Sequence, residues 1–107
     1  MKRTYNKLVR DKISEIIEKN GEKAIIKTLD DNEYRASLIE KAKEELWEVE
    51  TAESIDETKK ELADLLEVVR ALSEYNGFSL SQIIEEADKK AKERGGFSDR
   101  IFLLEVE

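Results

Sequence analysis

The residues with the clearest chemical meaning are five acids near the middle of the chain. Glu44, Glu45 and Glu48 are followed, after an interval of twelve residues, by Glu61 and Asp64. Residues three apart on an α-helix share a face, with Cβ atoms about 5–6 Å apart. Two helices joined by a short loop would fold into a hairpin and bring the two carboxylate pairs together. Carboxylates gathered in this way favour a hard divalent cation, Mg²⁺ or Mn²⁺.

A solvated acidic face is the alternative interpretation, because 26 of the 107 residues are Asp or Glu and such spacings also arise by chance. The helical wheel bears on this choice. At about 100° per residue, Glu61 and Asp64 fall inside the apolar arc of their helix. Glu45 borders the apolar stripe of the preceding helix, Glu48 lies about 60° to one side, and Glu44 points away. Carboxylates in apolar surroundings are costly unless protonated, paired or bound to a cation, so both interpretations stay open, with metal ligation strengthened.

Three capping boxes mark the starts of the helices that would position these acids. The N-cap residue and its partner three positions on are Asp30 with Glu33, Ser54 with Glu57, and Ser79 with Gln82. These boxes predict helices over about 30–52, 54–76 and 79–94. The spacing of isoleucines predicts a shorter helix over about 11–20.

Two short runs rich in branched apolar residues, 24–29 and 101–106, predict strands that pair with each other. Together with the helices they give a mainly all-α fold. Its expected centre is an antiparallel helical hairpin in a four-helix-type bundle, with a short two-stranded β element beside it. No repeat or linker composition divides the chain, so we expect residues 1–107 to form one domain.

Composition excludes several kinds of chemistry. The chain has no Cys and no His, which rules out thiolate nucleophiles, imidazole bases and zinc sites built from these ligands. Its net charge of −7 argues against binding to a nucleic-acid polymer, whose phosphates need a surplus of Lys and Arg. No apolar run approaches the roughly 20 residues of a membrane span, and residues 1–12 (MKRTYNKLVRDK) lack the apolar core of a signal peptide. We therefore expect a cytoplasmic protein that makes no membrane contact.

The acidic pattern, Glu44-Glu45-x-x-Glu48 and then Glu61-x-x-Asp64, resembles the signature of the MazG-like all-α nucleoside triphosphate pyrophosphohydrolases. Residues 5–13 (YNKLVRDKI) resemble the opening segment of a small branch described as phosphoribosyl-ATP pyrophosphohydrolase-like. Residues 94–97 (RGGF) with 101–103 (IFL) resemble the closing segment of that branch. Together these matches span most of the chain. One departure is Ser14, where the branch commonly has Pro, and Ser is compatible with an early helical turn.

The resemblance implies an α-helical fold around the hairpin, assembled as a homodimer or homotetramer. It implies Mg²⁺-dependent cleavage of a nucleotide between its α- and β-phosphates, with a nucleoside monophosphate and pyrophosphate as products. The metal ligands it implies are Glu45, Glu48, Glu61 and Asp64. With no His in the chain, Glu45 or Glu48 would hold or deprotonate the attacking water, as the chemistry of phosphoanhydride hydrolysis requires.

Basic residues near the two ends of the chain are candidates for binding the substrate phosphates. Lys7, Arg10 and Lys12 lie just before or within the first expected helix, and Arg94 ends the last one. A helix start also attracts anions through its free N–H groups, which favours the segment at Arg10. The alternative is that these are solvated surface charges. Trp47 falls opposite the apolar stripe of its helix, where it would contact a partner subunit.

Three functional hypotheses follow. The leading one is a nucleotide pyrophosphohydrolase that depends on Mg²⁺, or on Mn²⁺ in its place, and clears non-standard or surplus nucleotides. The second keeps the reaction and makes phosphoribosyl-ATP the substrate, which places the protein in histidine synthesis. The third is a non-catalytic helical interaction module, whose acids can be replaced at little cost to folding.

Overall fold

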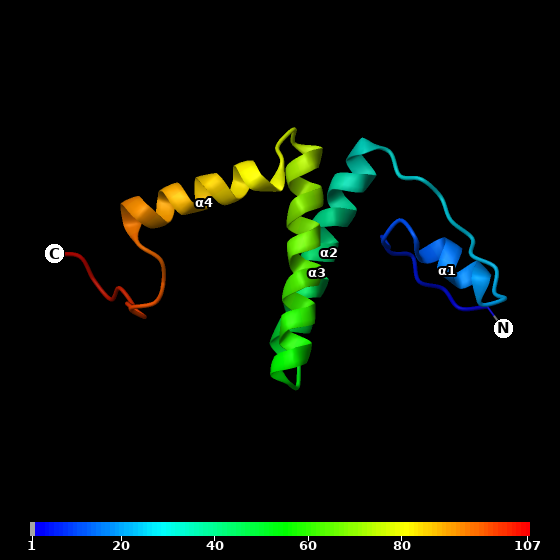
Figure 1. Cartoon of the computed structure of the whole chain (residues 1–107), viewed down its shortest axis with the longest axis horizontal. Helices are drawn as coiled ribbons and strands as arrows, with labels where there is room; N and C mark the ends of the chain where they lie inside the picture. Colours follow the sequence, from blue (N-terminus) through cyan, green and yellow to red (C-terminus); the bar gives the residue numbers. More distant parts are fainter. Residues whose placement is uncertain (1) are drawn as a thin grey trace.

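The computed structural model describes residues 2–107, and this part of the chain is all-helical. Four helices follow one another: α1 (Ile13–Lys19), α2 (Asp31–Thr51), α3 (Ile55–Tyr75) and α4 (Leu80–Arg94). Helices α2 and α3 lie side by side and antiparallel, α4 leaves the end of α3 at a steep angle, and α1 lies on the opposite side of the hairpin (Figure 1). None of the described helices is long and apolar enough to cross a membrane.

Two of the three expected capping boxes form in full. At the start of α2, the amide of Glu33 donates to the Asp30 side chain at 2.8 Å, and the Asp30 amide donates to the Glu33 carboxylate at 3.3 Å. Ser79 and Gln82 exchange the matching pair of hydrogen bonds at α4, at 3.2 and 2.8 Å. Each box satisfies two of the N–H groups that a helix start leaves unpaired. The sequence prediction of these two helix starts is confirmed.

The third box, at the start of α3, forms only in half. The Glu57 amide donates to Ser54 Oγ at 3.1 Å, as expected. The Glu57 carboxylate accepts from the amide of Glu53 at 3.0 Å rather than from Ser54. The connection between α2 and α3 is so tight that the side chain reaches one residue further back. This short turn forces the two helices to run antiparallel.

The packed core lies between α2 and α3. Leu38 of α2 and Val68 of α3 are the buried apolar side chains of the described chain. Near the open end of the hairpin, Tyr34 and Tyr75 meet edge to face with ring centroids 6.0 Å apart. Such aromatic pairs add about 0.5–1.5 kcal/mol to the burial of their surface. The hairpin is therefore the part of the chain that fixes the relative positions of side chains on α2 and α3.

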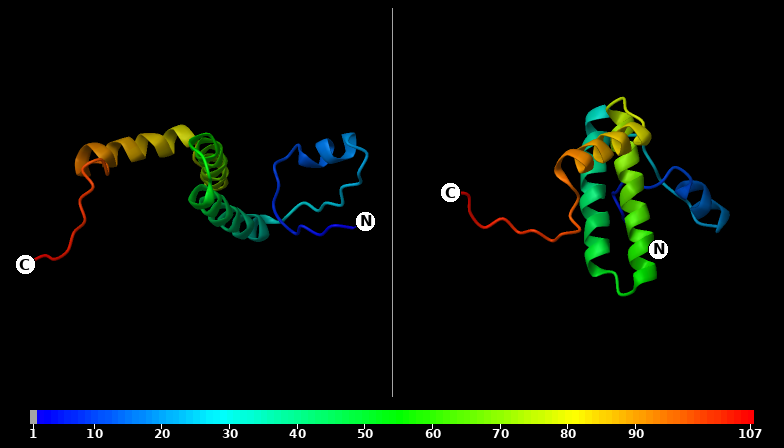
Figure 2. Two further views of the ribbon diagram at one scale, coloured as in Figure 1. Left: turned by 90° about the horizontal axis from the view of Figure 1, so that it is seen from below. Right: turned by 60° about the vertical axis from the view of Figure 1, so that its left-hand side comes forward.

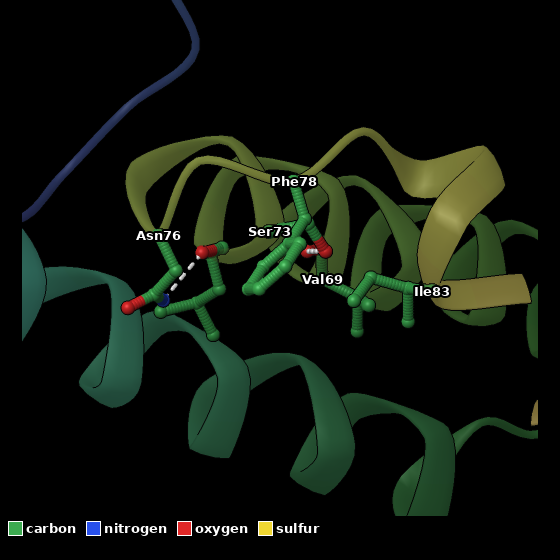
Figure 3. Close-up of a pocket in the computed structure, with 6 residues that line it drawn as sticks. Val69, Ser73, Asn76, Phe78 and Ile83 are labelled. Carbon is green, nitrogen blue, oxygen red and sulfur yellow. Dashed lines mark hydrogen bonds between the residues drawn. The ribbon is translucent and has the colours of Figure 1, made fainter. Parts of the chain in front are cut away.

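A tight connection joins α3 to α4. The Phe78 amide donates to the Ser73 carbonyl at 2.9 Å, and Gly77 supplies the left-handed backbone that the turn needs, with φ of +87°. Asn76 closes the helix end by donating to the Leu72 carbonyl at 2.7 Å. A shallow hollow lies here, and all its lining residues are apolar or uncharged (Figure 3). They are Val69, Leu72, Ser73, Asn76, Phe78 and Ile83.

The chain is elongated. Its radius of gyration is 18.1 Å and its extents are 61, 35 and 25 Å. A compact domain of this length has a radius of gyration of about 13 Å. Packing between the described helices joins α2 to α3 and α3 to α4, while α1 stands apart on its loop. One copy alone thus leaves much of its apolar surface uncovered.

The prediction of a two-stranded β element is wrong, because no strand forms in residues 2–107. Residues 24–29 and 101–106 are both extended, but they lie at opposite ends of the molecule with the hairpin between them (Figure 2). A strand exists only where a neighbour satisfies its backbone N–H and C=O groups. Composition predicted the extended backbone, and the separation of the two segments prevents their pairing within one chain.

Candidate metal centre

Three carboxylates meet across the hairpin: Glu45 of α2 with Glu61 and Asp64 of α3. One oxygen from each lies within 4.8 Å of the others. Glu45 stands six residues before the end of α2 and Glu61 six residues after the start of α3, so the two are level across the turn. Asp64 follows Glu61 by one turn on the same face. We call these three residues the acidic cluster.

The members of the acidic cluster differ in burial. Glu45 is the deepest, with 8% of its surface exposed, whereas Glu61 and Asp64 are half-buried. The nearest cation on α2 is Lys41, whose Nζ lies 3.5 Å from Glu45 Oε1. A buried carboxylate needs such a partner, and this ammonium group is shared with Glu44, from whose Oε1 it lies 3.4 Å away. The cluster is therefore buried on the α2 side and open to solvent on the α3 side.

The electrostatics of the cluster appear most clearly at Glu61, whose pKa is raised above the ordinary glutamate value of 4.5. Partial desolvation is the largest cause, followed by the negative charges of Asp64, Glu45 and Glu48. A hydrogen bond with the Glu45 side chain raises the pKa further. The neighbouring negative charges favour a bound positive charge, whether a proton or a metal cation, while desolvation and the hydrogen bond favour the protonated carboxyl group.

Glu48, the fourth ligand implied by the resemblance, lies beside the cluster. It is half-buried one turn beyond Glu45, and its charge is among the causes that raise the pKa of Glu61. In the described chain it is not one of the three residues whose oxygens lie within 4.8 Å of one another. The structure thus brings three of the four expected carboxylates into direct proximity and leaves the fourth at their edge.

Two of the four candidate phosphate-binding residues also reach this region. Arg10 Nη2 donates to Asp64 Oδ1 at 2.7 Å, and Lys7 Nζ lies 3.6 Å from Glu44 Oε1. Glu44 also pairs with Lys41 at 3.4 Å, so it holds two cations next to the cluster. Arg10 and Asp64 are 54 positions apart, so local sequence spacing could not have predicted their ion pair. The segment before α1 is thereby fastened to the hairpin.

The other two candidate cations lie elsewhere. Lys12 is the exposed N-cap residue of α1 and makes no capping hydrogen bond with its side chain. Arg94 is the last residue of α4, and that end of the helix lies away from the hairpin (Figure 1). One copy of the chain does not bring either residue to the acidic cluster.

The donor set of the cluster fits a hard divalent cation. All three candidate ligands are carboxylate oxygens, and the chain contains no Cys or His that would select zinc. Oxygens on opposite sides of one Mg²⁺ lie about 4.2 Å apart, since each bond is about 2.1 Å. The carboxylate oxygens lie within 4.8 Å of one another, close enough to face one shared cation. The exposed α3 side leaves room for water and for an anionic substrate.

Comparison with known proteins gives one limited similarity. No protein-family model matches the chain, and no solved structure matches it. An uncharacterized protein of Mycolicibacterium smegmatis (strain ATCC 700084 / mc(2)155) is 45% identical over 49 residues. That alignment covers 46% of this chain and 50% of the other protein, so the chain spans about half the length of the relative it matches.

Proposed function

We propose that this protein is a Mg²⁺-dependent nucleotide pyrophosphohydrolase. It would hydrolyse a nucleoside triphosphate between the α- and β-phosphates and release a nucleoside monophosphate and pyrophosphate. The observation that carries the proposal is the acidic cluster, with carboxylate oxygens of Glu45, Glu61 and Asp64 within 4.8 Å of one another. The resemblance of the acidic pattern to the MazG-like superfamily supports the same reaction. Clearing non-standard or surplus nucleotides is the role that we infer.

The acidic residues would divide the work between metal binding and water activation. Glu45, Glu61 and Asp64, with Glu48 beside them, would hold the cation. When bound, Mg²⁺ or Mn²⁺ supplies charge neutralisation for the phosphates and lowers the pKa of a bound water. Glu48 is half-buried at the edge of the cluster, which suits it to orient the attacking water or accept its proton. Glu45 is the second candidate for that task.

The cations beside the cluster would hold the triphosphate. Arg10 is paired with Asp64 at 2.7 Å and remains half-exposed, so its remaining N–H groups can donate to phosphate oxygens. Lys7, at 3.6 Å from Glu44, adds a second positive charge on the same side. For Lys12 and Arg94, a role in phosphate binding rests on the family resemblance. It requires a second copy of the chain to bring these residues close to the acidic cluster.

We also propose that the protein is a homodimer or homotetramer. Large apolar side chains remain about half exposed on the hairpin, on both α2 and α3. They are Leu46, Trp47, Leu62 and Leu66. Two hairpins packed face to face would cover these residues and form a four-helix bundle. Trp47, with 58% of its surface exposed, is the aromatic residue best placed to contact the second copy.

The test is pyrophosphate release from a panel of standard and modified nucleoside triphosphates and phosphoribosyl-ATP, with Mg²⁺ and with EDTA. We expect equal amounts of nucleoside monophosphate and pyrophosphate from triphosphates, and no release in EDTA. Turnover of phosphoribosyl-ATP alone would favour the second hypothesis. Inorganic phosphate as the product would contradict cleavage between the α- and β-phosphates. A folded protein that is silent on the whole panel would favour the interaction module.

A further inference from the structure

Residues 97–106 follow α4, and we call them the apolar arm: a turn over 97–100, in which the Arg100 amide donates to the Phe97 carbonyl at 3.0 Å, is followed by residues 101–106 without regular secondary structure. It contains six large apolar residues: Phe97, Ile101, Phe102, Leu103, Leu104 and Val106. Their side chains are almost fully exposed, with 82% of Phe102 and 83% of Leu104 accessible. Soluble proteins rarely leave a contiguous apolar patch of this kind uncovered unless it is an interaction site. The arm therefore needs a binding surface.

A second unpaired segment lies at the other end of the molecule. Residues 24–29 connect α1 to α2 in an extended conformation, and Ile25 and Ile26 are 82% and 68% exposed. Branched apolar residues of this kind favour strands. An extended segment with unpaired backbone N–H and C=O groups is a ready template for another strand. We call residues 24–29 the receiving segment.

The arm cannot reach the receiving segment of its own chain. The two lie on opposite sides of the hairpin along the 61 Å axis of the molecule (Figures 1 and 2). Ile101 lies seven positions after the end of α4, and such a stretch spans at most about 24 Å when fully extended. A second copy of the chain offers the same segment without this restriction.

We propose that residues 101–106 of the apolar arm of one copy add as a β-strand to the receiving segment of a second copy. In the exchange that we propose, the contact is reciprocal: each copy both donates an arm to its partner and receives the partner's arm. A two-fold axis then relates the two contacts, and the assembly closes as a dimer. Main-chain hydrogen bonds would supply much of the affinity, and the alternating side chains would supply the specificity.

Charge favours this pairing between copies. The chain as a whole carries a net charge of −7, so two copies repel each other. Locally the charges are complementary: Lys27 lies within the receiving segment and Lys23 directly before it, while Glu105 lies within the arm and Glu107 directly after it. Lys27 stays exposed even though its Nζ lies 3.1 Å from Glu33 Oε2. Opposite charges on neighbouring strands stabilise the pair and set its register.

The apolar side chains of the arms supply a large part of the area that a stable dimer buries. A phenylalanine buries about 150–250 Å² when it is covered. The two phenylalanines of each arm would therefore contribute about 600–1,000 Å² over two arms. The aliphatic side chains and the surface that they cover come in addition. Standard stable interfaces bury about 1,600 Å² in total.

Cross-linking tests the exchange directly, because the natural chain has no Cys. Ile26→Cys and Leu104→Cys are made in separate chains, mixed, and treated with a short bismaleimide that tolerates a one-residue shift in register. We expect a cross-linked dimer from the mixture and little from either variant alone. The matched control replaces Ile26→Cys by Glu53→Cys, at the exposed tip of the hairpin. A yield no higher than that of this control would overturn the proposal. So would a cross-link within one chain when Ile26→Cys and Leu104→Cys are placed in the same chain.

Charge reversal supplies a second test that does not depend on cross-linking. Lys23→Glu with Lys27→Glu should weaken dimerisation several-fold in sedimentation, because two attractive contacts become repulsive in each half of the dimer. Adding Glu105→Lys and Glu107→Lys should restore it. Circular dichroism checks that the helices are intact. Failure of the second pair to restore association, or a wild-type chain that stays monomeric at all concentrations, would refute the exchange. Neither test depends on the proposed enzymatic activity.

Discussion

Replacing Glu45 by Gln should weaken divalent cation binding without changing the shape of the acidic cluster. Glu45 is the most buried of the three carboxylates and lies level with Glu61 across the hairpin. Gln keeps the size of the side chain and one ligand oxygen, but it removes one negative charge. The perturbation therefore isolates the electrostatic contribution of that residue.

The magnitude follows from Coulomb's law. A carboxylate charge bound to a divalent cation lies about 3 Å from it, and even with the dielectric constant of water the attraction is about 2.8 kcal/mol. This is a lower limit for Glu45, because only 8% of its surface is exposed. Since each 1.4 kcal/mol is a factor of ten in affinity, Glu45→Gln should raise the Kd for Mg²⁺ about 100-fold or more.

Titration calorimetry with MgCl₂ measures this change, with MnCl₂ as a second cation. The matched control is Glu50→Gln, an exposed residue of the same helix that carries the same charge change. It lies on another face of α2, where solvent and salt screen its charge, so its effect should be less than twofold. Circular dichroism confirms that both variants keep their helices. A Kd for Glu45→Gln within threefold of wild type, or an equal loss in Glu50→Gln, would refute the assignment.

Three further predictions concern pH, helix capping and assembly. Because the pKa of Glu61 is raised in the folded state, the metal-free protein should lose stability as the pH rises from 4.5 through the raised pKa of this residue. Thermal denaturation at several pH values measures this loss, and Glu61→Gln should not show it. Asp30→Ala should cost about 1 kcal/mol in chemical denaturation, because it removes the carboxylate that accepts from the Glu33 amide at 2.8 Å; an unchanged midpoint would contradict that. Trp47→Ala should weaken self-association in sedimentation, and an unaltered profile would reject its interface role.

The hairpin and its carboxylates could be predicted because they depend on local rules. Capping residues fix where α2 and α4 begin, and the short connection at Ser54 fixes the antiparallel direction of α2 and α3. With direction and loop length set, the register that places Glu45 opposite Glu61 follows from 3.6 residues per turn. The wheel also placed Glu45 at the edge of the core stripe, where the structure buries it.

Contacts between distant parts of the chain could not be predicted in this way. The Arg10 ion pair with Asp64 depends on how the segment before α1 folds back onto the hairpin. Composition identified residues 24–29 and 101–106 as extended, but pairing depends on where α4 carries the second segment. For the same reason Arg94 could not be placed relative to the acids: local spacing gives the end of α4 but not its direction.

The most direct test of the proposed function is metal-dependent pyrophosphate release by matched proteins: wild type, Glu45→Gln and Glu50→Gln. Each is given the preferred nucleoside triphosphate of the panel at saturating Mg²⁺, and both products are quantified. We expect wild type and Glu50→Gln to release nucleoside monophosphate and pyrophosphate in equal amounts, and Glu45→Gln to lose nearly all turnover while remaining folded. Full turnover by Glu45→Gln, or release by wild type that persists in EDTA, would contradict a hydrolase built on the acidic cluster.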